Sequence, residues 1–103
     1  TPRRVAHGCP VAKLMLDIPA DDGFDSTRKT GRAIFTSLIN WLADNFTQDG
    51  ISDDTAQKAA RRIILRWQGA IVLAHAMNDR TILDDEIADL RQTAERTLTA
   101  GAA

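Results

Sequence analysis

His7 and Cys9 are the two residues in this sequence whose types and close spacing could do chemistry. An imidazole beside a thiol could bind a metal ion, or it could activate the thiol as a nucleophile. A metal site needs further ligands, however, and this is the only cysteine, while the other histidine, His75, lies far along the chain. A catalytic thiol also needs a base held by a third group. We therefore expect no metal, no cofactor and no catalysis here, and we interpret Cys9 as a small residue at the start of a helix.

Paired acids and short basic groups are the next candidates for chemistry. The acids fall in predicted loops or first helical turns, where they cap helices and compensate the helix dipole. The chain has 13 basic and 14 acidic residues and a net charge of -1, so no overall field attracts nucleic acid. We interpret the basic groups as solvated helix faces. The acids are Asp21-Asp22, Asp53-Asp54 and Asp84-Asp85, and the basic groups are Arg28-Lys29-Arg32 and Arg61-Arg62-Arg66.

Length and composition indicate one domain over residues 1–103. With 103 residues and 44% hydrophobic content, the chain can build only a modest core. The single cysteine excludes an internal disulfide and suits a reducing cytosol, so a cytoplasmic location is expected. The densest apolar run, Gly69 to Met77, is about half of the ~20 residues that a membrane span needs. We expect no contact with a membrane.

The apolar residues recur at helical spacing, which predicts an all-α fold. All three prolines lie in the first 20 residues, and no alternation typical of strands persists. The expected architecture is an antiparallel bundle of four main helices, the last two forming a hairpin for dimerisation. The first runs from Pro10 to Pro19; the second is capped by Asp25 or Ser26 and ends before Gly50; the third is capped by Ser52 and reaches Met77; the fourth follows the Asn78-Asp79 break and ends at Gly101.

The third predicted helix is apolar on two sides and therefore needs two partners. One partner is its own domain, and we expect the other to be a second copy of the chain. Gly69 would let two backbones approach closely. Which of the two apolar sides of this helix faces the partner is left open by the sequence. The expected interface combines the second row of the third helix, Leu65, Gly69, Val72 and Ala76, with the apolar row of the fourth, Leu83, Ile87, Leu90 and Ala94.

The apolar faces of the first three helices converge if they share one interior, which predicts a site for a small apolar or amphipathic ligand. Gln68 or His75 could supply a polar contact. The alternative is that the same side chains fill a close-packed core. The expected pocket residues are Met15, Phe35, Leu38, Ile39, Leu42, Ile64, Trp67, Ile71 and His75.

Three segments resemble the C-terminal half of TetR-type transcriptional repressors. Gly8-Cys9-Pro10-Val11-Ala12, followed by Leu14 and Leu16-Asp17, is similar to the opening of the sixth helix of that family. The run Trp67-Gln68-Gly69-Ala70-Ile71-Val72-Leu73-Ala74 is similar to its long eighth helix. Asn78-Asp79, followed by Leu83 and Leu90, resembles the turn into the ninth.

The resemblance implies a homodimer in which the last two helices of each subunit form a four-helix bundle, with an effector pocket inside each subunit. It also implies a helix-turn-helix that precedes Thr1 and reads operator DNA in the major groove. The expected function is the regulatory domain of a TetR-like repressor, not an enzyme. We expect no sequence-specific DNA binding by this chain alone.

Two other classes stay open. A stand-alone helical dimerisation or adaptor module without ligand would have its own start codon immediately before Thr1. A small all-helical enzyme, such as a mutase, would need basic and acidic side chains converging on inward faces, and the predicted inward faces are apolar. The gene sequence upstream of Thr1 distinguishes the first of these from the regulatory domain.

Overall fold

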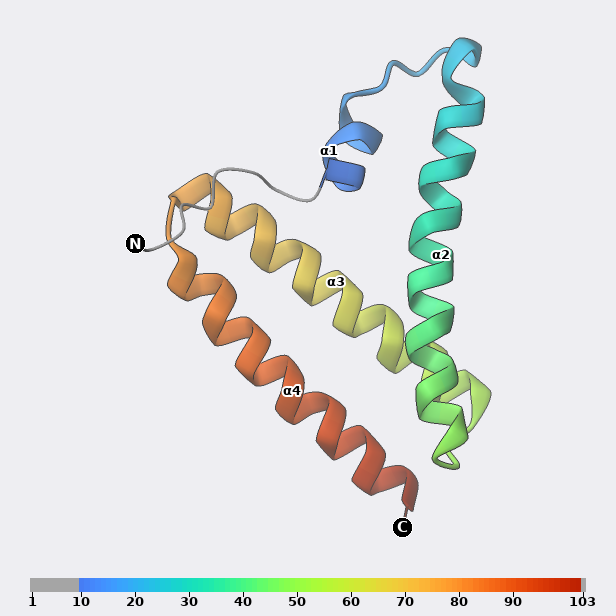
Figure 1. The fold of residues 1–103 in the computed structure, drawn as a ribbon, viewed down its shortest axis with the longest axis vertical. Helices are drawn as coiled ribbons and strands as arrows, with labels where there is room; N and C mark the ends of the chain where they lie inside the picture. Colours follow the sequence, from blue (N-terminus) through green and yellow to red (C-terminus); the bar gives the residue numbers. More distant parts are fainter. Residues whose placement is uncertain (1–9, 103) are drawn as a thin grey trace.

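The computed structural model describes residues 10–102, and over this range the chain is all-α, as predicted (Figure 1). His7, Gly8 and Cys9 lie outside the described residues. Four α-helices and one 3₁₀ turn follow one another: α1 (Pro10–Asp17), η1 (Asp22–Phe24), α2 (Asp25–Gln48), α3 (Asp53–Met77) and α4 (Arg80–Ala102).

The junction between α1 and α2 is built differently from the expectation. Asp21, not Asp25 or Ser26, accepts a backbone hydrogen bond, from Gly23 at 3.0 Å. The prediction of a side-chain cap on α2 is wrong, because the η1 turn winds directly into the helix and Phe24 precedes it without a cap bond. Arg28 holds the junction by donating to the carbonyl oxygen of Pro19 at 2.6 Å.

The other two junctions follow the sequence signals. Gly50 adopts a positive φ of 91° after α2, and the Ser52 hydroxyl caps α3 by accepting from the N–H of Thr55 at 3.4 Å. After α3, Asn78 takes the left-handed conformation, and Asp79 caps α4 by accepting from the N–H of Thr81 at 3.0 Å. Helix α4 ends one residue later than predicted, since Gly101 still lies within it.

Helices α3 and α4 form the hairpin, lying side by side and antiparallel, and α2 crosses the N-terminal part of α3 (Figure 1). The main core lies where the end of α2, the start of α3 and the end of α4 meet. Phe46 is its only aromatic side chain, and the other buried members are three alanines and Ile51. The cluster consists of Ala43, Phe46, Ile51, Ala56 and Ala60, with Ile39, Leu42, Ala59, Ile63, Ala94 and Leu98 packed against it.

One protomer leaves much apolar surface uncovered. Its radius of gyration is 15.9 Å and its extents are 47 × 40 × 18 Å, whereas a compact domain of 100 residues has a radius of about 13 Å. Two tryptophans, Trp41 and Trp67, are 64% and 36% exposed. The single chain therefore combines a thin core with an open shape.

Helix α1 is attached mainly to α2, and the attachment centres on Met15 and Gly31. Gly31 is buried in α2, and a Cβ built there would lie only 2.1 Å from the sulfur of Met15. The thioether thus occupies the space that any other residue at position 31 would fill. Met15 is the only one of the predicted pocket residues that α1 contributes.

We expect Gly31→Ala to loosen α1 without lowering the stability of the rest of the chain. The new methyl group displaces Met15, while the change favours helix α2 by up to about 1 kcal/mol. Amide hydrogen exchange should become faster in α1, and the urea midpoint should not fall. Ser37→Ala, at an exposed position of α2, is the matched control. Unchanged protection of α1 in Gly31→Ala would contradict the assigned contact.

Candidate dimerisation surface and effector site

Leu65, Gly69, Val72 and Ala76 form an exposed row on α3, which we call the outer α3 row. All four residues are exposed in the single protomer, with Leu65 at 69% and Val72 at 56%. At about 100° of rotation per residue, the row lies on the side of α3 opposite Ala60 and Ile64, which face the core. A Cβ added at Gly69 would meet nothing within 4 Å in the protomer. The surface is therefore open for a partner.

The predicted interface residues of α4 divide into two groups. Ile87 is 39% exposed and is open to a partner. Leu90 is only 7% exposed, and Leu83 and Ala94 are half-buried, since this side of α4 packs on α3 within the same chain. Little surface of Leu90 is left for another subunit. Among these four, Ile87 is thus the residue with the most exposed side chain.

The predicted pocket residues are distributed over the inner side of the fold rather than gathered at one point. Ile39 and Leu42 pack against the main core cluster, and Ile64 is buried at 7% exposure. Phe35, Leu38 and Ile71 are half-buried, Trp67 is 36% exposed and His75 is exposed. Among residues 10–102, the terminal oxygen of Gln68 is buried and has no hydrogen-bond donor. A buried acceptor of this kind is expected to find a donor from water or a ligand.

A hollow of about 230 Å³ lies between α1 and α2, which the sequence reasoning missed. It is lined on α1 by Val11 and Leu14, and on α2 by polar side chains together with Gly31 and Ile34. The small residue Gly31 within the long second helix was the available signal for a close approach. The position of α1 over it could not be read from periodicity.

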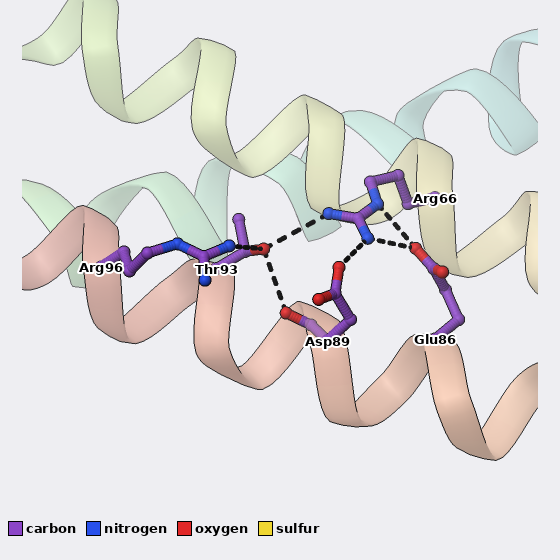
Figure 2. Close-up of polar contacts among 5 residues, drawn as sticks. All are labelled: Arg66, Glu86, Asp89, Thr93 and Arg96. Atoms are coloured by element: carbon purple, nitrogen blue, oxygen red, sulfur yellow. Dashed lines mark hydrogen bonds and ion pairs between the residues drawn. The ribbon is translucent and has the colours of Figure 1, made fainter.

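Arg66 ties the two helices of the hairpin together (Figure 2). Its guanidinium donates from α3 to the carboxylates of Glu86, at 2.6 Å, and Asp89, both on α4. It also donates to the hydroxyl of Thr93 at 3.3 Å. The expectation that the Arg61-Arg62-Arg66 group is a solvated face is therefore wrong for Arg66, whose side chain is 33% exposed. Contacts from one guanidinium to three residues on successive turns of α4 fix the register of α3 against α4.

The contacts between Arg66 and Asp89 shift the pKa values of both groups. The hydrogen bond from Arg66 is the largest cause that lowers the pKa of Asp89 below its ordinary value, and Coulombic attraction adds to it. The bonds to Asp89 and Glu86 raise the pKa of Arg66. The ion pair is therefore formed at neutral pH.

We expect Asp89→Asn to destabilise the chain at pH 7 and to lose this effect in acid. A carboxyl whose pKa is lowered by folding stabilises the folded state above its unfolded pKa, near ~4, and this contribution disappears as the pH falls through the folded-state value. Urea midpoints of the variant and the parent chain should thus converge below about pH 4. Asp85→Asn, an exposed neighbour, is the control. A midpoint difference that is the same at pH 7 and pH 3 would refute the role of Asp89.

Among residues 10–102, no group of three or more histidine, cysteine or acidic side chains is arranged to hold a metal ion. Within the same range, no helix is long and apolar enough to cross a membrane.

Comparison with known protein families gives a match over most of the chain. The family described as the C-terminal domain of LmrA/YxaF-like transcriptional regulators, a TetR-type C-terminal domain, matches residues 2–89. No curated protein and no solved structure matches the chain. The family match extends from before α1 through α3 and into α4, and it agrees with the three segments that resemble TetR-type repressors. The chain therefore belongs to the LmrA/YxaF-like family of TetR-type C-terminal regulatory domains.

Proposed function

We propose that this chain is the dimerising and effector-sensing part of a TetR-like repressor, and that a helix-turn-helix preceding Thr1 contacts operator DNA. The family match supports the regulatory role. The observation that carries the proposal is the outer α3 row, an exposed apolar strip on the long helix of the hairpin. In this proposal, residues 1–103 form a single regulatory domain.

Dimerisation through the outer α3 row explains why apolar side chains stay exposed in the protomer. Two copies related by a two-fold axis would place each row against its counterpart, with Gly69 allowing the backbones to approach. Two such helices per subunit can bury the ~1,200–2,000 Å² of a standard interface.

The effector site is proposed on the inner side of α1, α2 and α3. Phe35, Trp67 and Ile71 offer apolar surface there, and the buried oxygen of Gln68 offers an acceptor. These features favour a small apolar or amphipathic effector that carries a hydrogen-bond donor. An effector acts only if it binds operator-competent and operator-incompetent states differently. Helix α1, which is held mainly by α2, is the element suited to move.

A screen of small apolar compounds, read by thermal stabilisation and by tryptophan fluorescence, tests the effector site. The expected hits change the emission of Trp67, so Trp41→Phe keeps the response and Trp67→Phe loses it. If hits leave Trp67 unperturbed, the effector binds elsewhere.

The isolated chain should also show no sequence-selective DNA binding at ~150 mM salt. Nanomolar selective binding by this chain alone would overturn the division of roles.

A further inference from the structure

The groove between the N-terminal half of α3 and the C-terminal end of α4 contains a hollow of about 500 Å³ that the proposed effector site does not use. This volume falls within the range of ~300–1,000 Å³ that is typical of small-molecule sites. Its lining mixes apolar, hydroxyl and charged side chains. The lining residues are Ile51, Ser52, Asp54, Thr55, Lys58, Ala59, Arg62, Thr97 and Ala100.

The apolar part of the lining lies next to the main core cluster. Ile51 is 6% exposed and belongs to the main core cluster, and Ala59 packs against that cluster. Ala100 contributes a third apolar side chain, from α4. An apolar group of a ligand would therefore cover the outer side of the core where α2, α3 and α4 meet.

Two cationic side chains line the hollow, and one of them has no ion-pair partner among residues 10–102. Lys58 and Arg62 lie one turn apart on α3 and both line the hollow. Lys58 already pairs with Asp54 at 3.1 Å. Arg62 makes no hydrogen bond or ion pair among residues 10–102, so the three side chains leave a net positive charge at this wall. The guanidinium group offers a planar fork that suits a carboxylate.

We propose that this hollow binds an amphipathic carboxylate, with its carboxylate on Arg62 and its apolar body over Ile51, Ala59 and Ala100. The hydroxyl group of Thr55 stands on the same lining. It accepts from Ser52 at 3.0 Å, so its own proton is available to the head group, whereas the hydroxyl of Thr97 already donates to the carbonyl oxygen of Thr93 at 2.9 Å. A ligand bound here touches both helices of the hairpin. It would therefore stabilise the α3–α4 arrangement from a place separate from Phe35, Trp67 and Ile71.

The test uses decanoate, below its micelle-forming concentration, as the probe for the unmodified chain. Decanoate should raise the melting temperature in a saturable way, whereas decanol and decyltrimethylammonium should not. Backbone amide NMR shifts on titration should be largest around Ile51, Thr55, Arg62 and Ala100. Loss of the charge-assisted bond in Arg62→Gln should weaken binding about tenfold. The matched control is Arg61→Gln, an exposed neighbour that does not line the hollow, and it should bind as the parent does.

Four results would overturn this inference. The first is the absence of saturable decanoate binding, and the second is equal binding of the cationic probe. The third is an NMR response around Phe35, Trp67 and Ile71. That result would mean that decanoate binds at the proposed effector site and not in this hollow. If Arg62→Gln weakens the self-association of the chain while decanoate binding stays unchanged, Arg62 serves an interface between copies and not a ligand.

Discussion

Val72→Asp should convert the proposed dimer into monomers or aggregates. Val72 lies in the outer α3 row and is 56% exposed in the single chain, so most of its side chain lies outside the internal packing. In the proposed dimer the new carboxylate would be buried without a partner, which is strongly unfavourable. The dissociation constant should rise on the order of a hundredfold or more, as measured by light scattering after size-exclusion chromatography.

Ala88→Asp is the matched control for this change. Ala88 is exposed on α4, and its position along the helix turns it away from α3 at about 100° per residue. The same charge there should leave the dimer intact. If both variants remain dimeric, the outer α3 row is not the interface; if Ala88→Asp alone dissociates, the interface lies on the far side of α4.

Phe46→Ala should have the largest effect on folding. Phe46 is 2% exposed and is the only aromatic side chain of the main core cluster, which is otherwise built from alanines and one isoleucine. Replacing a buried phenylalanine by alanine costs about 3–5 kcal/mol, which is a large part of the ~5–15 kcal/mol that stabilises a domain. Urea denaturation followed by circular dichroism should show a much lower midpoint or no folded baseline.

Phe35→Ala provides the comparison, because Phe35 is only half-buried and lies outside this cluster. Its loss should be clearly smaller than that of Phe46→Ala. A reversed order would mean that the centre of the core lies nearer the α1 end of α2 than the structure places it.

Local signals in the sequence were sufficient for the α3 boundaries. Ser52 caps the helix through its own hydroxyl, and Asn78 and Asp79 make the turn with groups that are neighbours in the chain. The start of α2 was predicted wrongly because Asp21 caps the η1 turn and Arg28 reaches back to Pro19. A contact that spans the end of one helix and the start of the next leaves no periodic trace.

The outer α3 row was visible in the sequence because its spacing of three and four residues follows one side of a helix. The sequence did not show which apolar residues of α4 are buried within the chain. Leu90 and Ile87 share a predicted face, but Leu90 is 7% exposed and Ile87 is 39% exposed. The role of Arg66 also depends on register: its partners Glu86 and Asp89 lie some twenty residues away. Only the folded hairpin brings them together.

Sedimentation velocity of the unmodified chain over a range of micromolar concentrations tests the central claim most directly. Dimerisation through the outer α3 row predicts a species of twice the chain's 11.3 kDa mass that dissociates only on strong dilution. A single 11.3 kDa species throughout the range would contradict the assignment of this chain as a dimerising regulatory domain.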